Sequence, residues 1–192
     1  MSVCIVVEGN IGAGKSTVLS HIEKQGFKVF YENVDSWRPY LELFYAQPER
    51  WSFALQMAIL HDMAQQKKEA DKLNPEDHPY VFFERSPLSN MLFARMARML
   101  GNMTDLELHT YELFYEELCW KPEFTVLIDT PVITCLERVQ KRQRPGEAKI
   151  DLDYLQSVET FHRTGLEDID LTVTGTVDPV NVAGMITGGL GL

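Results

Sequence analysis

The order of apolar and polar positions divides this chain into short buried segments and longer amphipathic ones. Compact apolar runs rich in β-branched or aromatic residues predict strands at residues 3–7, 27–31, 80–83, 124–128 and, more weakly, 170–173. Apolar residues that recur every three or four positions predict helices at residues 17–25, 51–68, 87–100, 105–119, 131–142 and 152–164. This alternation predicts an α/β fold, a five-stranded parallel sheet with helices on both faces.

Proline and glycine mark the borders between these segments. Pro48 interrupts a helical region, and the polar residues 70–79, with two prolines, predict a loop. Pro145 and Gly146 end the helix at 131–142, and a short helix followed by a glycine-rich tail closes the chain. Because there is no repeat and no linker, residues 1–192 predict a single domain.

One predicted helix carries a clear apolar stripe. Within residues 105–119 the stripe is formed by Leu108, Tyr111, Phe114 and Tyr115. Their helical spacing predicts that this face of the helix is buried.

A glycine-rich loop lies between the first strand and the first helix. It has the pattern G-x-x-x-x-G-K-S, in which backbone N–H groups and a helix N-terminus cradle phosphate. Lys15 can reach the β- and γ-phosphates, and the Ser16 hydroxyl can bind Mg²⁺. A dinucleotide loop would need glycine at Thr17, so the sequence predicts a nucleoside triphosphate site of the P-loop NTPase type. The predicted contacts are Gly9, Asn10, Ile11, Gly12, Ala13, Gly14, Lys15, Ser16 and Thr17.

Composition narrows the possible partners. With 28 acidic and 18 basic residues the net charge is −10, which argues against a nucleic-acid-binding surface. Three scattered cysteines fit neither a disulfide framework nor a zinc site. No apolar run reaches the roughly 18 residues of a membrane span, and the chain starts directly in a strand, so we expect a cytoplasmic protein without a targeting peptide.

Charged residues follow two of the predicted strands. Glu32 is either a general base for a substrate hydroxyl or a solvated loop residue. Glu84 can hold Mg²⁺, and Arg85 can contact the acceptor oxygen or the moving phosphoryl group; alternatively, these two side chains pair with each other. Parallel strands place their carboxyl ends at one edge of the sheet, where ligands bind.

A basic run follows at Arg138, Lys141, Arg142 and Arg144. Arg138 and Arg142 are four residues apart on one predicted helix face, as in an anion clamp, although a charge run is also typical of a solvated face. We predict an arginine-rich lid at about residues 138–150. The base-reading N-K-x-D and the D-x-x-G of switch GTPases are absent from the sequence. A small-molecule phosphotransferase remains.

Together these motifs resemble the deoxynucleoside kinase family of cellular and herpesviral enzymes. The resemblance covers residues 3 to about 178, and the size resembles compact kinases of large DNA viruses such as ranaviruses. Glu32 with Trp37 and the later Gln56 match by spacing. The remaining motifs are E-G-N-I-G-A-G-K-S-T at 8–17, Y-x-x-P-E-R-W-S-F at 45–53, F-F-E-R-S at 82–86 and K-R-Q-R-P-G-E at 141–147.

The resemblance implies a role for each matching residue at the phosphate-transfer centre. Glu32 would take the proton of the 5′-hydroxyl, Arg85 would hold that hydroxyl and the phosphoryl group, and Glu84 with Ser16 would bind Mg²⁺. Asp178 would lie near the ATP adenine. Three lid arginines would cover the phosphates, namely Arg138, Arg142 and Arg144.

The acceptor pocket is implied in the same way, with departures from the family pattern. Tyr45 and Glu147 would bind the 3′-hydroxyl, and Gln56 would read the base. Asn33 replaces a frequent proline. Ala94 stands where the family stacks an aromatic ring on the base, so either the neighbouring Phe93 takes that role or the stacking is weakened.

Two further replacements bear on the base. Met63 and Asn90 stand where deoxycytidine kinases carry arginine and aspartate, so we expect thymidine to be favoured, with deoxycytidine and purines possible. The resemblance thus implies an ATP- and Mg²⁺-dependent deoxynucleoside 5′-kinase of nucleotide salvage. The alternatives are a thymidylate kinase and a non-catalytic nucleotide-binding protein.

The resemblance also implies a homodimer formed through the helix at 87–100. An apolar stripe on that helix is compatible with such an interface and equally compatible with the core; it consists of Met91, Leu92, Met96 and Met99.

Overall fold

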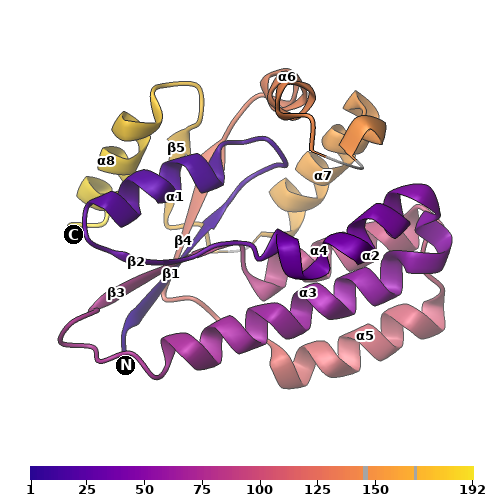
Figure 1. The fold of residues 1–192 in the computed structure, drawn as a ribbon, viewed down its shortest axis with the longest axis horizontal. Helices are drawn as coiled ribbons and strands as arrows, with labels where there is room; N and C mark the ends of the chain where they lie inside the picture. The colour runs from indigo at the N-terminus through magenta and orange to yellow at the C-terminus, as the bar shows by residue number, and fades with distance from the viewer. Residues whose placement is uncertain (145–146, 167) are drawn as a thin grey trace.

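The computed structural model describes residues 1–144, 147–166 and 168–192. Its centre is a five-stranded parallel sheet with the strand order β2-β3-β1-β4-β5 (Figure 1). The strands are β1 (Val3–Glu8), β2 (Lys28–Phe30), β3 (Tyr80–Glu84), β4 (Phe124–Asp129) and β5 (Leu171–Thr174). The predicted α/β fold of the P-loop NTPase type is confirmed.

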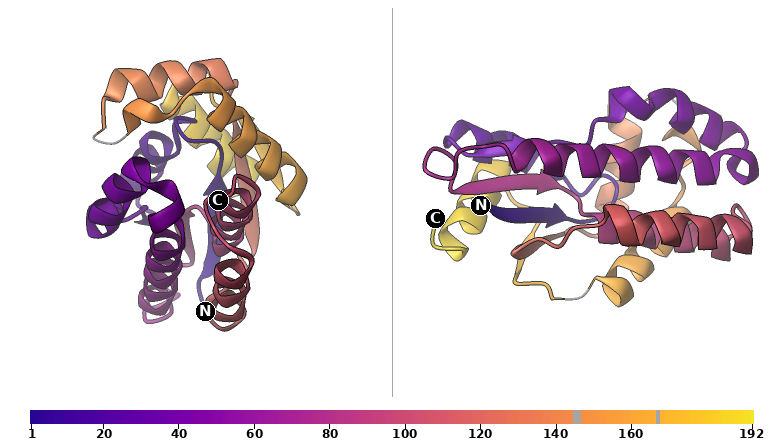
Figure 2. Two further views of the ribbon diagram at one scale, coloured as in Figure 1. Left: turned by 90° about the vertical axis from the view of Figure 1, so that its right-hand side faces the viewer. Right: turned by 90° about the horizontal axis from the view of Figure 1, so that it is seen from below.

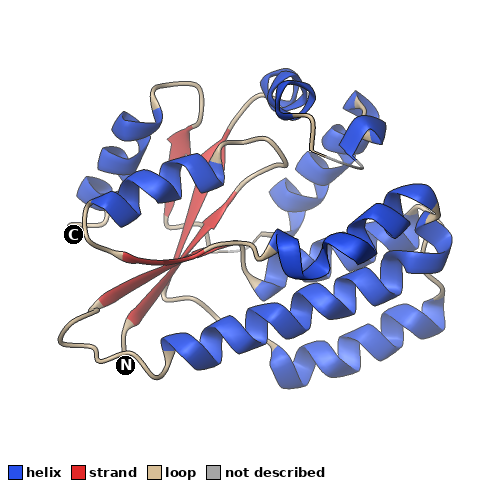
Figure 3. Ribbon diagram, viewed as in Figure 1, coloured by secondary structure: helices blue, strands red, loops and turns tan. Residues whose placement is uncertain are grey.

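Eight α-helices surround the sheet within the described residues (Figure 3). They are α1 (Lys15–Lys24), α2 (Val34–Ala46), α3 (Pro48–Ala70), α4 (Pro87–Met99), α5 (Asp105–Leu118), α6 (Val132–Arg142), α7 (Leu152–Gly165) and α8 (Pro179–Gly189), with a short 3₁₀ helix, η1, at Glu147–Lys149. Pro48 and Pro87 each begin a helix. Proline suits this position because it lacks a backbone N–H, and N–H groups in the first turn of a helix have no intrahelical acceptor. The predicted break at Pro145 and Gly146 lies outside the described residues.

Alternate residues of the strands build two apolar layers. On one face of the sheet, Ile5 and Val7 belong to the large core that includes residues of α1 and α8. On the other face, Cys4 and Val6 pack with the end of α3 and with Trp120. Because both faces are covered, the strands are almost continuously apolar, as is typical of parallel sheets.

Beyond the sheet, α3, α4 and α5 form a helical subdomain with its own core. Figure 2 shows α3 and α5 running side by side. Leu60, Met91, Ala94 and Tyr111 are buried in this core. The subdomain forms one wall of the site described below.

Two expectations from the sequence, one about a helix face and one about the C-terminal tail, need correction. Tyr111 is fully buried, but Phe114 is 49% exposed, so its place in the buried stripe was wrong. Phe114 lies at the edge of the stripe, where the helix has already turned away from its neighbours. The glycine-rich tail is also wrong, because Gly184, Gly188 and Gly189 belong to α8.

The apolar stripe of α4 is mostly internal. Met91, Leu92 and Met96 are buried within the subunit, and only Met99 is exposed. Leu92 packs against Gly165 of α7, where an added Cβ would lie 2.3 Å from a Leu92 methyl carbon. The stripe is therefore accounted for largely by the core, and the homodimer stays a prediction.

A search of the described helices finds no segment long and apolar enough to cross a membrane.

Candidate active site

The carboxyl ends of the strands open into a cavity of about 720 Å³. The phosphate loop and α6 form one side, and residues of α2, α3 and α4 form the other. All but three of the residues predicted for the site line this cavity. The exceptions are Gly9, Asn10 and Asp178.

The phosphate loop connects β1 to α1 and is closely packed from below. Gly9 has φ 147°, and a Cβ there would lie 2.7 Å from the Ile128 carbonyl oxygen. A Cβ at Gly12, with φ 83°, would lie 2.5 Å from the Cys135 carbonyl oxygen. Glycine is therefore required at both positions.

Lys15 is folded back onto this loop. Its Nζ donates to the carbonyl oxygens of Gly9 (3.2 Å) and Asn10 (3.1 Å). Burial, aided by the nearby positive charge of Arg85, lowers the pKa of Lys15 to about 8. Lys15 thus lines the cavity at the place where the sequence predicts the β- and γ-phosphates.

Three residues predicted to touch ATP have structural bonds of their own. Asn10 donates from Nδ2 to the Leu155 carbonyl oxygen at 3.0 Å, which ties the loop to α7. Arg138 donates to the carbonyl oxygens of Ala13 (3.0 Å) and Gly175 (2.8 Å), so it braces the loop while still lining the cavity. Asp178 accepts from the Val180 N–H and caps α8.

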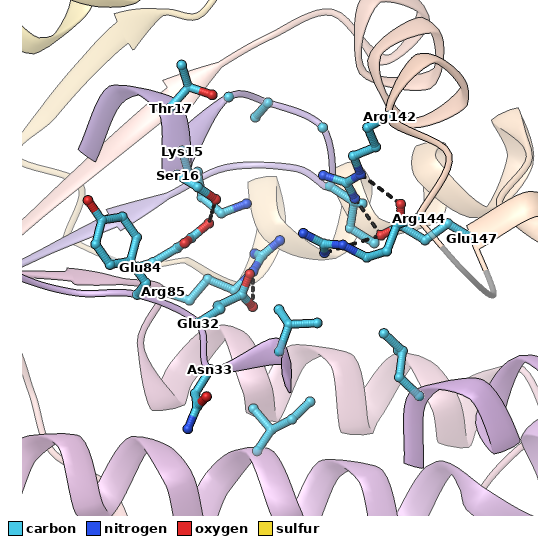
Figure 4. A pocket seen from close by; sticks show the side chains of 18 of the residues that line it. Lys15, Ser16, Thr17, Glu32, Asn33, Glu84, Arg85, Arg142, Arg144 and Glu147 are labelled. Atoms are coloured by element: carbon cyan, nitrogen blue, oxygen red, sulfur yellow. Dashed lines mark hydrogen bonds and ion pairs between the residues drawn. The ribbon is translucent and has the colours of Figure 1, made fainter. Parts of the chain in front are cut away.

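The predicted metal ligands meet at the start of α1. The Ser16 hydroxyl donates to Glu84 Oε1 at 2.7 Å (Figure 4). Burial and the nearby Glu32 raise the pKa of Glu84. A hydroxyl and a carboxylate beside a phosphate loop are hard oxygen ligands of the kind that Mg²⁺ uses together with nucleotide phosphates. The donor set therefore fits the metal that the resemblance implies.

Glu32 and Arg85 form an ion pair in the cavity beside the phosphate loop. Arg85 Nε lies 3.1 Å from Glu32 Oε1 (Figure 4). Thus, among the described residues, Arg85 pairs with Glu32, and Glu84 bonds to Ser16. Arg85 has φ 70°, a left-handed conformation that is strained for a residue with a side chain and that often marks functional sites.

A carboxylate that the sequence analysis left without a role holds this strained turn. Glu8, at the end of β1, is fully buried, and burial raises its pKa. It accepts hydrogen bonds from the Ser86 N–H (2.8 Å) and hydroxyl (2.6 Å), and its Oε2 lies 3.8 Å from Arg85 Nη1. In the sequence Glu8 is visible only as an acidic residue at the end of an apolar strand. Its partners, Arg85 and Ser86, come from the turn after β3 and appear only in the folded structure.

The lid residues converge on one carboxylate. Arg142 donates from Nε to Glu147 Oε2 at 2.7 Å and from Nη2 to Oε1 at 2.5 Å, and Arg144 Nη1 lies 3.5 Å from Oε1 (Figure 4). Lys149 Nζ donates to the Tyr45 carbonyl oxygen at 2.6 Å. These contacts bring the predicted phosphate clamp and the predicted 3′-hydroxyl pair, Tyr45 and Glu147, to one wall of the cavity.

Four neutral residues of α3 and α4 line another part of the cavity, which we call the base end: Gln56, Met63, Asn90 and Phe93. Asn90 Nδ2 donates to Gln56 Oε1 at 2.6 Å, and the Tyr111 hydroxyl donates to Asn90 Oδ1. Neither bond was foreseen from the sequence, because the partners come from three different helices.

The rotation of α4 places Phe93, and not Ala94, at the cavity. Ala94 is fully buried in the helical subdomain, whereas Phe93 lines the cavity. The Arg85 guanidinium lies 5.1 Å from the Phe93 ring centroid. The ring of His162, on α7, packs edge-on against Phe93 with 5.5 Å between the ring centroids. Phe93 therefore connects the base end to the arginine at the phosphate loop.

Two further residues that line the cavity are Tyr154 and Asn33. Tyr154 of α7 lines the cavity, and burial raises its pKa to about 12. Asn33 lies at the start of α2 and donates to Asp62 of α3 at 3.3 Å, which ties the loop after Glu32 to that helix. Tyr154 could not be assigned to the cavity from the sequence, because an aromatic residue on an amphipathic helix can line a pocket or fill a core equally well.

Comparisons with known proteins show the family to which the chain belongs. The family model for deoxynucleoside kinases matches residues 5–184. A putative deoxynucleoside kinase of Frog virus 3 (isolate Goorha) is 27% identical over 181 residues, 91% of each chain. A deoxyguanosine kinase of Bacillus subtilis (strain 168) is 33% identical over 181 residues, which cover 91% of this chain and 85% of that protein.

A solved structure is similar over almost the whole fold. The deoxyadenosine kinase from M. mycoides, described with the products dCMP and a flexible dCDP bound, has a TM-score of 0.84 and 26% identity, with 98% of each chain covered. The family match, the shared fold and the gathered site lead to one conclusion: this chain belongs to the deoxynucleoside kinase family.

Proposed function

We propose that this deoxynucleoside kinase transfers the γ-phosphoryl group of ATP to the 5′-hydroxyl of deoxynucleosides, in a Mg²⁺-dependent reaction of nucleotide salvage. The observation that carries the proposal is the Glu32–Arg85 pair beside the phosphate loop. A base and a cation at that place suit an acceptor hydroxyl that must lose a proton and meet a phosphoryl group.

In the proposed mechanism, Glu32 accepts the proton of the 5′-hydroxyl while that oxygen forms its bond to the γ-phosphorus. The bond from phosphorus to the bridging oxygen breaks, and ADP leaves with the electron pair. Arg85, held by Glu8 and Glu32, orients the hydroxyl and stabilises the charge on the moving group. Lys15 stabilises the β- and γ-phosphates.

Mg²⁺, held by Ser16 and Glu84 together with phosphate oxygens, would neutralise charge on the phosphates. Arg142 and Arg144 would close over the phosphates, and Arg138 would keep the phosphate loop in shape. Glu147, the partner of Arg142 and Arg144, would also accept a hydrogen bond from the 3′-hydroxyl of the sugar beside Tyr45. Positioning and charge stabilisation thus account for the chemistry, as in phosphoryl transfer generally.

For the base we propose that thymidine is among the substrates. Met63 and Asn90 are neutral and buried at the base end, so these two positions carry no charged pair that demands one base. Deoxycytidine and purine deoxynucleosides remain within its chemistry, because Gln56 can both donate and accept.

The test is ATP-dependent phosphorylation, with Mg²⁺, of thymidine, deoxycytidine, deoxyadenosine, deoxyguanosine and dTMP in parallel. Turnover of one or more nucleosides, lost when Mg²⁺ is chelated, supports the proposal. Turnover of dTMP alone would make the protein a thymidylate kinase. If ATP binds and no acceptor is phosphorylated, the proposal is wrong and a nucleotide-binding role replaces it.

A further inference from the structure

A buried hydrogen-bond chain runs from the helical subdomain to the cavity. It starts at the Tyr111 hydroxyl of α5, passes through the Asn90 amide of α4 and ends at the Gln56 amide of α3. Gln56 and Asn90 line the cavity, whereas Tyr111 lies behind them and is fully buried. A residue that never meets the ligand is thus bonded to two that face it.

The hydroxyl proton of Tyr111 fixes the direction of this chain. Among the described residues, Asn90 Oδ1 is the acceptor that the hydroxyl reaches. If the Asn90 amide were turned over, its Nδ2 would donate to the tyrosine oxygen and the tyrosine proton would be left buried without an acceptor. Leaving a buried donor unpaired is costly, so the amide is held with Oδ1 toward Tyr111 and Nδ2 toward Gln56.

The same direction is passed on to Gln56. Because Asn90 donates to Gln56 Oε1, the Gln56 amide is held with its Nε2 away from Asn90. The second N–H of Asn90 and both N–H groups of Gln56 have no hydrogen-bond partner among the described residues. The polar edge offered to the base end is therefore rich in donors.

Base edges differ in what they present to such donors. Thymine O4 and guanine O6 accept hydrogen bonds, whereas the amino groups of cytosine and adenine donate them. We propose, as a refinement that depends on the proposed function, that this kinase prefers deoxynucleosides whose base carries an oxygen at pyrimidine C4 or purine C6. In this proposal Tyr111 is the positioning residue that sets the preference.

Two matched pairs of nucleosides test the preference in the wild-type enzyme. Deoxyuridine and deoxycytidine differ in the oxo or amino group at C4 and its accompanying ring protonation, and deoxyinosine and deoxyadenosine differ in the same way at C6. In the proposed pose Gln56 Nε2 meets the group at C4 or C6, and the second lone pair of Gln56 Oε1 meets the adjacent ring nitrogen. We expect kcat/KM to be at least about tenfold higher for the oxo member of each pair, because the amino member places a donor against Nε2 and a ring acceptor against Oε1. Equal values, or higher values for the amino members, would overturn the proposal.

Variants then ask whether Tyr111 sets the ratio. Tyr111→Phe removes one hydroxyl and frees the Asn90 amide to turn over, so both ratios should fall to about threefold or less while the KM for ATP is unchanged. The matched control is Tyr115→Phe: Tyr115 stacks on Tyr111 from the same helix and makes no side-chain hydrogen bond among the described residues. Its ratios should equal those of the wild type.

The outcomes separate the two proposals. A Tyr111→Phe enzyme that keeps the wild-type ratios would assign the hydroxyl a structural role alone and overturn its positioning role. If that variant does not fold, as judged by its thermal melt, the wild-type pairs still decide the preference. If no nucleoside is phosphorylated, the proposed function fails, and calorimetric binding of the same four nucleosides decides the base preference without turnover.

Discussion

The two ends of the cavity are built in different ways. At the phosphate end, charged groups stand at the start of α1 and at or just after the ends of β2 and β3. Lys15 bonds to backbone carbonyl groups of the phosphate loop, whereas Glu84 and Glu32 bond to the side chains of Ser16 and Arg85. At the base end, neutral side chains from α3 and α4 are held by one another and by Tyr111 of α5.

Under the proposed function, the difference reflects what each end would recognise. Triphosphate is the same in every reaction, so a fixed array of charges on strand ends and a glycine-rich loop suffices. A base is identified by the direction of a few hydrogen bonds, and those directions depend on how buried amides are turned. Charge therefore determines one end, and the orientation of neutral groups determines the other.

The largest expected effect lies at the phosphate end. Replacing Glu32 with alanine removes the proposed base, so kcat should fall by about 10²–10⁴-fold while ATP still binds. Arg85 would keep Glu8 as a buried partner. The measurements are kcat at saturating deoxynucleoside and the Kd of ATP.

The matched control for this variant is Glu42→Ala, because Glu42 is an exposed glutamate of α2 that does not line the cavity. It should leave kcat unchanged. A Glu32→Ala enzyme with near-normal kcat would show that Glu32 is not the base.

An intermediate effect is expected at the base end. Gln56→Leu removes the paired amide contact and leaves Asn90 Nδ2 without its acceptor, so kcat/KM for a deoxynucleoside should fall about 10–100-fold. The KM for ATP should not change, since the two ends are held by separate bonds. Steady-state kinetics with each substrate varied in turn measures both.

Gln65→Leu is the matched control, because Gln65 belongs to the same helix, α3, and does not line the cavity. The contrast between the two ends would break down if Gln56→Leu raised the KM for ATP as much as that for the nucleoside.

The smallest effect concerns pH. His162, which supports Phe93, is 5% exposed, and neither ring nitrogen has a hydrogen-bond partner among the described residues. Burial, followed by the positive charges of Arg85 and Lys15, lowers its pKa to about 2. Below about pH 6.5 this histidine is therefore protonated in the unfolded chain but stays neutral in the folded protein. As the pH falls, the residue lowers the free energy of unfolding by up to about 1.4 kcal/mol per pH unit.

Denaturant unfolding of wild type and His162→Gln between pH 7 and 5 measures that contribution, because the other titrating groups are common to both proteins. The pH dependence of stability should be shallower in the variant. His109→Gln, at an exposed position of α5, should keep the wild-type slope. Identical slopes for His162→Gln and wild type would mean that the buried imidazole accepts a proton in the folded state.

The strand and helix pattern and the residues of the phosphate end could be predicted from the sequence. The glycine loop, Lys15, Ser16 and the charged residues after β2 and β3 could be predicted because local pattern and strand polarity bring them to one edge of the sheet. The edges of apolar stripes were less certain: Phe114 proved exposed, and the terminal glycines proved helical, because packing decides such positions and propensity does not.

The contacts among the remaining groups depend on how the helices and strands pack. Glu8 obtains its partners from the turn after β3, Phe93 reaches the cavity because α4 is rotated to bury Ala94, and Tyr111 finds Asn90 across two helices. In the sequence a buried tyrosine that fills a core and one that orients an amide are the same letter. The physical difference is a hydrogen bond between residues 21 positions apart, and it exists only once the helices have packed.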